Sequence, residues 1–221
     1  MSLPEEIVGV SAVPPEFSRV AADMFGNRLP LAQQYASLLA NEGIEWGLIG
    51  PREYDRIWER HIMNSLCVSA LIPKGLFVAD LGSGAGLPGI VLAIAREDLY
   101  VDLVEPMGRR CDFLSMCVAK LGLSETVNVV RTRVEDYQVT PDVLTCRALA
   151  NMSSLVELTS RFIPPGTLLA IKGEKAPAEV ESASTILRTR GLQAEIIRPT
   201  MDNIQLGTVV RVSSDMNMIT Q

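Results

Sequence analysis

The sequence predicts an α/β fold in which an N-terminal helical extension precedes a doubly wound, mostly parallel sheet of seven strands. Two observations predict it: short apolar runs alternate with helical stretches from residue 76 onward, and the last two runs leave no room for a helix between them. A chain of 221 residues is long enough for one such core with a modest helical addition. We therefore expect residues 1–72 to form the N-terminal segment and helical extension, and residues 73–221 the core, within one compact domain.

The N-terminal part is expected to hold a loose lead-in and two helices. Residues 1 to about 15 carry several prolines and little periodicity, so we expect no role for them in the core. Apolar residues then recur at helical spacing, at Leu31, Tyr35, Leu38 and Leu39. A second helix is expected from Pro51, because proline is favoured at a first helical position. One face of this helix gathers Tyr54, Ile57, Trp58, His61 and Ile62, and a basic stripe beside it holds Arg52, Arg56 and Arg60.

Seven strands are expected after this extension. The first five are predicted at residues 76–81, 100–105, 127–131, 143–146 and 167–172, and the helical stretches between them imply parallel pairing. The last two, at 194–197 and 207–212, are separated by a short polar segment. Because so short a connection can join only antiparallel neighbours, these two strands should form an antiparallel pair that closes the sheet.

Composition excludes several classes of protein. The apolar share of 48% and the charged share of 21% are ordinary for a folded globular chain. No apolar run approaches the roughly 18 residues that span a bilayer, and Glu5 and Glu6 precede any basic residue, unlike a secretory leader. We expect a cytoplasmic protein without a membrane span. A net charge of −6 restricts any contact with nucleic acid to a local basic patch.

The cysteines and the single histidine predict no metal site. The chain has four cysteines and one histidine, and none of the cysteines shows a C-x-x-C spacing. We therefore expect reduced thiols that are mostly buried.

A glycine-rich loop is predicted at the end of the first strand. Asp80 ends that strand, and the chain then turns through Gly82, Gly84 and Gly86 into a helix, so that bare backbone can approach a ligand at the helix N-terminus. Glu105 ends the next strand, close to the roughly 20 residues downstream at which an acidic side chain binds ribose hydroxyls. The expected ligand therefore contains an adenosine.

Three readings of this loop remain open on the residues alone. Gly84-x-Gly86-x-x-Gly89 also fits the pattern of nicotinamide-dependent enzymes, and the loop could be a tight turn without a ligand or the site of a non-catalytic sensor. The nicotinamide reading is weakened because the loop follows a long helical extension and because no histidine lies downstream of it. S-adenosylmethionine fits this arrangement better.

Several motifs in order and spacing resemble one family. They are the stretches 58–66, 80–89, 133–135, 146–148 and 172–173. Across roughly residues 25–212 the chain resembles the bacterial 16S ribosomal RNA guanine-N7 methyltransferases, also called glucose-inhibited division protein B. The resemblance implies a class I (Rossmann-like) methyltransferase fold and S-adenosyl-L-methionine as cofactor. It also implies transfer of a methyl group to N7 of one guanosine in a 16S rRNA loop near the decoding centre.

The resemblance also implies which residues form the site. The cofactor-binding set is Asp80, Gly82, Gly84, Gly86, Leu87, Glu105, Val134, Glu135 and Arg147, and the set in contact with RNA is Arg60, His61, Asn64, Ser65 and Lys172. We expect no general acid or base, because guanine N7 already carries an in-plane lone pair and the task is one of orientation. The expected partner is 16S rRNA, alone or in an assembled or assembling small subunit, and the expected enzyme is a monomer without metal.

Some of these side chains admit a structural role as well. His61 is either a hydrogen-bonded core histidine or a contact to substrate or cofactor. The basic stripe is either a solvated surface or, at Arg60, an RNA contact. Lys172 is either a surface lysine or a phosphate contact at the carboxyl end of a strand.

Overall fold

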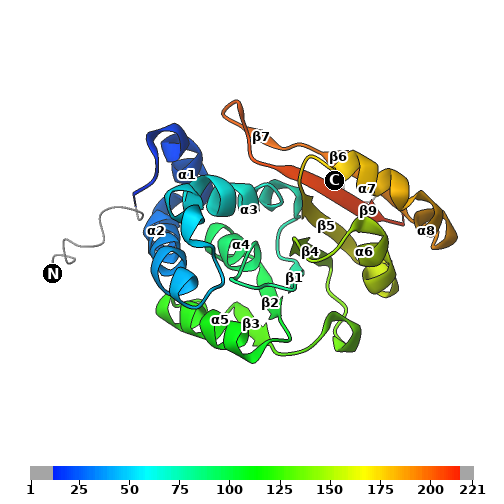
Figure 1. Cartoon of the computed structure of the whole chain (residues 1–221), viewed down its shortest axis with the longest axis horizontal. Coiled ribbons are helices and arrows are strands. Elements are labelled where there is room, and N and C mark those ends of the chain that lie inside the picture. Colours follow the sequence, from blue (N-terminus) through cyan, green and yellow to red (C-terminus); the bar gives the residue numbers. More distant parts are fainter. Residues whose placement is uncertain (1–11, 215–221) are drawn as a thin grey trace.

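The chain folds into a central sheet with helices on both faces (Figure 1). The structure is a computed structural model that describes residues 12–214, so most of the expected lead-in and the last residues of the expected core lie outside it. Among the described residues, no helix combines the length and the apolar character needed to cross a membrane.

The sheet has seven strands in the order β3-β2-β1-β4-β5-β9-β6. Their bounds are β1 Phe77–Leu81, β2 Tyr100–Val104, β3 Val127–Val130, β4 Val143–Arg147, β5 Thr167–Lys172, β6 Gln193–Ile197 and β9 Thr208–Ser213. The first five pair in parallel, whereas β9 pairs antiparallel with both β5 and β6. Each strand lies within two residues of its expected position, and the expected antiparallel closure is confirmed.

The helices that follow the strands lie on opposite faces of the sheet. They are α4 Gly89–Ala95, α5 Gly108–Lys120, α6 Met152–Thr159, α7 Ala176–Ser182 and α8 Ser184–Thr189. Successive side chains of a strand point to opposite faces. In β5, accordingly, Leu169 and Ile171 join a core with α4, α5 and the N-terminal helices, whereas Leu168 and Ala170 join a second core with α6, α7 and α8.

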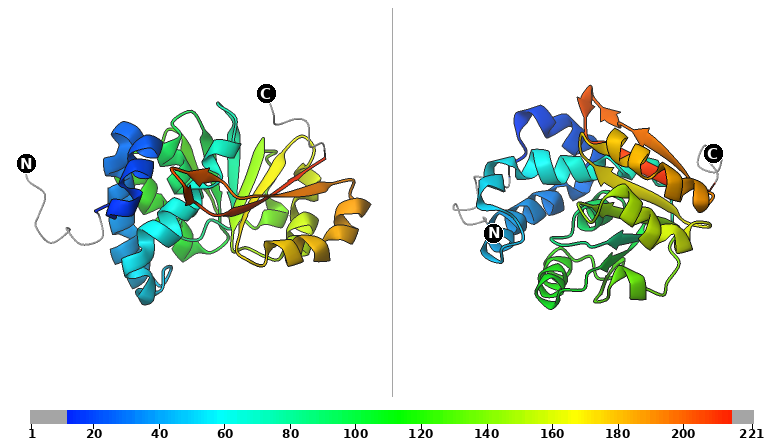
Figure 2. Two further views of the ribbon diagram at one scale, coloured as in Figure 1. Left: turned by 90° about the horizontal axis from the view of Figure 1, so that it is seen from above. Right: turned by 45° about the vertical axis from the view of Figure 1, so that its right-hand side comes forward.

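The N-terminal extension packs beside α4 and α5, on one face of the sheet (Figure 2). It contains α1 Ser18–Phe25, α2 Leu29–Leu38 and α3 Asn64–Leu66. The periodicity predicted α2 but missed α1. Val13, in the expected lead-in, is partly buried against this core, so the expectation that the lead-in has no core role is wrong at that residue.

The second predicted helix exists but is irregular. A 3-10 stretch, Pro51–Arg56, leads into a π-helical stretch, Trp58–Met63, and then into α3, with proline at the expected first position. Ile57, His61 and Ile62 are buried as expected. Tyr54, which was expected on the same face, is 41% exposed, because the first turns are 3-10 turns and do not keep the α-helical spacing of that face.

A small hairpin joins β6 to β9. Its strands are β7 Thr200–Met201 and β8 Ile204–Gln205, and Asp202 and Asn203 between them both have positive φ, as the two central residues of a type I′ turn require. Arg19 of α1 lies 3.5 Å from Asp202, and Met201 and Ile204 pack against the N-terminal core. The hairpin therefore rests on the helical extension.

All four cysteines are buried and free, as expected. Burial raises the pKa of the Cys67, Cys117 and Cys146 thiols to about 12, so they are protonated at neutral pH.

One hydrogen bond ties the extension to the predicted glycine loop. The hydroxyl of Tyr35, on α2, donates to the backbone oxygen of Ala85 at 2.6 Å, and the whole side chain is buried. Burial raises the pKa of this phenol well above its ordinary value, so it remains a donor. The contact joins two segments that are far apart in the chain.

We therefore expect Tyr35→Phe to lower the free energy of unfolding by about 1 to 3 kcal/mol, because the Ala85 oxygen loses its buried partner. Urea unfolding measures this change. Tyr54→Phe removes an exposed hydroxyl from the same extension and should change stability little. Equal losses in the two variants would contradict the structural role of the Tyr35 bond.

Candidate active site

The glycine loop is anchored at the carboxyl end of β1. Asp80 is fully buried, and its Oδ2 accepts a hydrogen bond from the backbone N–H of Gly89, the first residue of α4, at 3.0 Å. The N–H groups of Gly82 and Ser83 both donate to the backbone oxygen of Val104. The loop is thus held to the ends of β1 and β2 and to the start of α4.

The glycines of this loop differ in what surrounds them. Gly82, Gly84 and Gly86 all have positive φ, which disfavours other residues. A Cβ on Gly82 would lie 2.6 Å from Leu149, and one on Gly86 would lie 2.5 Å from Ile90. A Cβ on Gly84 would meet only the Gly82 oxygen, at 3.8 Å. Among the three glycines of the loop, Gly84 is therefore the one whose backbone faces open space, which leaves room for a ligand.

Glu105 lies beside the loop at the end of β2 and is 1% exposed. One carboxylate oxygen accepts the Gly84 N–H and the other accepts the Met107 N–H, both at 3.0 Å. Arg110 lies 3.6 Å from the same carboxylate. A carboxylate has about four acceptor positions, so Glu105 can still accept hydrogen bonds from a ligand.

Val134 and Glu135 follow β3 in a short 3-10 turn, Val134–Asp136. Val134 is buried and Glu135 is exposed. The guanidinium of Arg161 holds this turn by donating to the backbone oxygens of Val134 and Tyr137. The turn therefore presents one apolar and one acidic side chain at the same edge of the sheet as the loop.

Arg147 ends β4 at this edge. Its Nη2 donates to Nδ1 of His61 at 2.9 Å, and its Nη1 is buried without a hydrogen-bond partner. Ala148, the next residue, has φ of 54°, an uncommon conformation for a residue other than glycine. The end of β4 is thus strained next to a buried, incompletely paired guanidinium.

His61 is buried and neutral. Burial lowers its pKa to about 4, with Arg147 and Arg60 adding to the effect. Its Nε2 lies 3.4 Å from a carboxylate oxygen of Glu53, within ion-pair distance but without hydrogen-bond geometry. This arrangement fits a histidine that orients its neighbours, and it does not provide a base poised near neutral pH.

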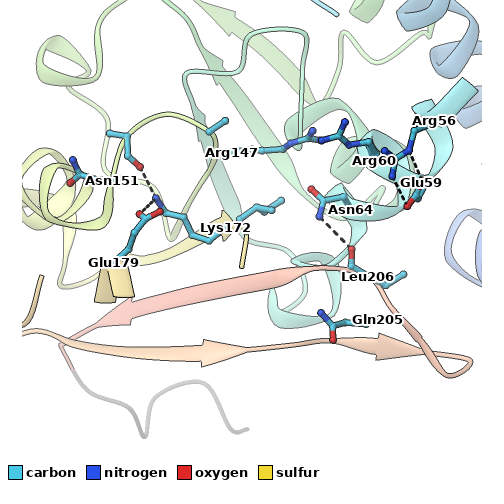
Figure 3. A pocket seen from close by; sticks show the side chains of 14 residues that line it. Arg56, Glu59, Arg60, Asn64, Arg147, Asn151, Lys172, Glu179, Gln205 and Leu206 are labelled. Atoms are coloured by element: carbon cyan, nitrogen blue, oxygen red, sulfur yellow. Dashed lines mark hydrogen bonds and ion pairs between the residues drawn. The ribbon is translucent and has the colours of Figure 1, made fainter. Parts of the chain in front are cut away.

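An open pocket of about 620 Å³ lies next to Arg147. It is bounded by the helical stretch 56–64, the loop after β4, the end of β5 and the end of the hairpin, and its lining includes Arg60, Asn64, Arg147, Lys172 and Gln205 (Figure 3). No residue of the glycine loop lines it. The pocket and the glycine loop therefore share no lining residue.

The structure gives several predicted RNA-contact residues internal partners. Lys172 Nζ donates to the backbone oxygen of Ala150 at 2.6 Å and lies 2.8 Å from a carboxylate oxygen of Glu179. Asn64 Nδ2 donates to the Leu206 oxygen at 3.4 Å. Ser65 is fully buried, its hydroxyl has no hydrogen-bond partner, and it does not line the pocket.

Two of the three arginines of the basic stripe, Arg56 and Arg60, are paired with carboxylates. Arg56 forms two hydrogen bonds with Glu59, and Arg60 Nη1 donates to Glu53 Oε1 at 2.6 Å. Both arginines are about half exposed and line the pocket, so their remaining donors face it. Sequence reasoning missed Glu53, although its position seven residues before Arg60 places both on one side of the helical stretch.

Comparison with known proteins identifies the family. Residues 28–205 match the GidB family, described as rRNA small subunit methyltransferase G. The chain is 48% identical to ribosomal RNA small subunit methyltransferase G of Thermobifida fusca, over 89% of this chain and 84% of that protein. It is 46% identical to the protein of that name from Mycolicibacterium smegmatis, over 83% and 80%.

The chain belongs to the GidB family.

Solved structures share the fold at low identity. A precorrin-6y C5,15-methyltransferase from Geobacter metallireducens aligns with a TM-score of 0.52 and 13% identity, over 76% of this chain and 90% of that chain. M. jannaschii TYW2, solved in complex with AdoMet, aligns with a TM-score of 0.53 and 16% identity, over 70% and 75%. This GidB chain therefore has the class I methyltransferase fold, and its antiparallel β9 excludes the plain dinucleotide-binding fold.

The open space at Gly84 allows ligand binding in this GidB chain to be tested against a matched control, Gly122. Gly84 and Gly122 have φ of +57° and +67°, and neither has a side chain in its way, so Gly84→Ala and Gly122→Ala should each cost about 1 kcal/mol of stability. Only Gly84→Ala should weaken binding of S-adenosylhomocysteine, by at least about tenfold in calorimetric titration. Normal binding by a folded Gly84→Ala variant would mean that the ligand lies elsewhere.

The buried state of His61 predicts an unusual titration. Because His61 is the only histidine, its C2 proton gives a single imidazole signal, whose shift should stay constant between about pH 5.5 and 8. The unfolded chain binds this proton near pH 6.5 and the folded chain near pH 4, so the contribution of His61 to stability falls as the pH drops through that window. A midpoint near pH 6.5 in the folded protein would contradict this environment.

Proposed function

We infer that this chain transfers a methyl group from S-adenosylmethionine to N7 of a guanosine in 16S rRNA. The observation that carries the inference is the GidB family match over residues 28–205, which includes the glycine loop and every residue that lines the pocket except Leu206. The edge of the sheet fits the cofactor, because Gly84 faces open space and Arg147 Nη1 is a buried donor without a partner.

We further propose how the cofactor-binding residues are used. Glu105 accepts hydrogen bonds from ribose hydroxyls, Val134 and Glu135 flank the adenine, and Arg147 lies at the end where the methyl group is transferred. The support is that their strand ends, β2, β3 and β4, surround the loop at one edge. Open α/β sheets bind ligands at the carboxyl ends of their strands.

The charges near the loop favour a cationic ligand. Asp80 and Glu105 are both buried, and the pKa of Asp80 is raised to about 7, chiefly by burial and further by the neighbouring Glu105. When bound, the cofactor supplies a positively charged sulfonium carrying the methyl group. Two buried carboxyl groups attract the sulfonium of the cofactor more strongly than the uncharged sulfur of the product, S-adenosylhomocysteine.

The pocket supplies orientation for the guanine. Its N7 carries a lone pair in the plane of the ring, so no proton has to be removed before attack and no general base is needed. The pocket offers the amides of Asn64 and Gln205 and the cations of Arg60 and Lys172, which suit the edge and phosphates of an unstacked nucleotide. We propose that Arg60, Asn64 and Lys172 contact RNA there, and that His61 acts through Arg147.

The net charge of the chain helps to decide between naked 16S rRNA and the small ribosomal subunit as substrate. A net charge of −6 leaves few phosphate contacts, which favours recognition of a folded surface over binding to naked RNA. We therefore propose the assembled or assembling small subunit as substrate, and a monomeric, metal-free enzyme that acts in the cytoplasm, where such subunits are made. Within residues 12–214, no group of three or more His, Cys, Asp or Glu side chains is arranged to hold a metal ion.

The function is tested by supplying methyl-labelled S-adenosylmethionine with small subunits, or with naked 16S rRNA, that lack the modification. We expect labelled 7-methylguanosine by mass spectrometry of the nucleosides, with subunits preferred over naked RNA. Glu105→Gln should bind S-adenosylhomocysteine more weakly by about 1.5 to 3 kcal/mol, because a charged acceptor is lost. A label in another nucleoside, or no label with either RNA, would refute the proposed function.

A further inference from the structure

Four polar side chains connect the helical extension to the end of β4. Arg60 Nη1 donates to Glu53 Oε1 at 2.6 Å, and the other oxygen of Glu53 lies 3.4 Å from His61 Nε2. On its far side, His61 Nδ1 lies 2.9 Å from Arg147 Nη2. We call this set, Arg60, Glu53, His61 and Arg147, the Glu53 relay. It runs from Arg60 to the guanidinium of Arg147, and both of these arginines line the pocket.

The chemistry of arginine fixes the tautomer of His61. A guanidinium has only donors, so Nδ1 of His61 must accept the hydrogen bond from Arg147 and cannot carry a proton. The neutral ring then carries its proton on Nε2, which is the nitrogen that faces Glu53. His61 is therefore hydrogen-bonded to Arg147 through Nδ1, and its Nε2–H lies within ion-pair distance of the Glu53 carboxylate but without hydrogen-bond geometry.

Glu53 is suited to this place because it presents an acceptor oxygen to each of two neighbours. One carboxylate oxygen faces the Arg60 donor and the other faces the His61 Nε2–H. An amide of the same shape has one oxygen and one NH2 group. Gln at this position would therefore turn a donor toward either Arg60 or His61, and the Arg60 contact, which is shorter and charged, would take the oxygen.

We propose that Glu53 is a positioning residue for methyl transfer, which holds His61 in the Nε2–H tautomer so that His61 in turn aims the Arg147 guanidinium at the reacting groups. The proposal rests on the proposed function, in which Arg147 lies at the transfer site. An independent observation supports it: Nη1 of Arg147 is buried without a partner, next to the strained residue Ala148. Such a donor fits an acceptor oxygen of a bound ligand, either the carboxylate of the cofactor or the carbonyl of the guanine.

The test substitutes Gln for Glu53 and reads the tautomer directly. Because His61 is the only histidine, a long-range 15N–1H NMR spectrum of the imidazole requires no assignment. We expect the Nε2–H form in the original protein. In Glu53→Gln we expect a population with the proton on Nδ1, in which Arg147 no longer donates to that nitrogen. We also expect methylation of small subunits to fall at least about tenfold.

The affinity for S-adenosylhomocysteine and the kcat of methylation together distinguish the two ligand oxygens. Weaker binding of S-adenosylhomocysteine to Glu53→Gln would identify the cofactor carboxylate as the partner of Arg147. Normal binding with a lower kcat would identify the guanine carbonyl. An unchanged Nε2–H tautomer in Glu53→Gln, or a shifted tautomer with normal methylation and normal cofactor affinity, would overturn the proposal.

A matched control separates positioning from stability. Glu42 resembles Glu53, because its side chain is 27% exposed, against 24% for Glu53, and accepts from Lys120 at 2.7 Å, away from the site. Glu42→Gln should match Glu53→Gln in melting temperature and should keep the methylation rate and the His61 tautomer of the original protein. A loss of methylation in both variants would assign the effect to stability and overturn the positioning role.

A second substitution should rescue the first. In Glu53→Gln/Arg60→Met no donor competes for the amide oxygen, which can then face His61 Nε2–H. We expect the Nε2–H tautomer to return. We also expect the double variant to methylate subunits, or to bind S-adenosylhomocysteine, better than the sum of the losses in the two single variants Glu53→Gln and Arg60→Met would give. Failure to restore the tautomer would contradict the relay. Absence of methylation by the original protein would instead refute the proposed function, while the tautomer would still test the relay.

Discussion

The buried carboxyl of Asp80 fixes the backbone around which the site is built. Its hydrogen bond to the N–H of Gly89 joins the end of β1 to the start of α4 and closes the glycine loop between them. The junction leaves no room for a side chain at Gly89, where a Cβ would lie 2.3 Å from Leu103 of β2. Because β1, β2 and β4 are parallel and in register, fixing this turn also fixes the distances from the loop to Glu105 and to Arg147. The geometry of this edge is therefore set by the packing of the sheet.

The N-terminal extension does more than cover one face of the sheet. Tyr35 holds the loop from one side, and the helical stretch that begins at Pro51 supplies His61, which holds Arg147 from the other. The same stretch carries Asn64, which reaches the backbone of Leu206 next to the hairpin. The glycine loop, Arg147 and one wall of the pocket are thus connected through one helical layer. This explains how a fold shared with methyltransferases of 13–16% identity can be adapted to one substrate without changing the sheet.

Local sequence patterns predicted the sheet well, because buried strands and turns leave periodic apolar runs and glycines at specific positions. The loop, Asp80, Glu105 and the antiparallel closure were all predictable in this way. The irregular turns that expose Tyr54 were not, since a 3-10 or π-helical turn leaves no separate period in so short a stretch. The partners of Arg147 and Lys172 were also beyond local patterns: His61 lies 86 residues from Arg147, and only the folded sheet brings them together. Glu53 was overlooked because its function depends on two neighbours that only the structure identifies.

We propose that the cofactor lies across the carboxyl edge of β1, β2 and β4, with Arg147 between it and the pocket. A crystal structure with S-adenosylhomocysteine tests this claim most directly. We expect the ribose to contact Glu105 and the adenine to lie beside Val134. The backbone of Gly84 should contact the ligand, and the sulfur should lie on the side of Arg147 that faces the pocket. Density for the ligand in the pocket itself, or at any place without contact to Glu105 and Gly84, would contradict it.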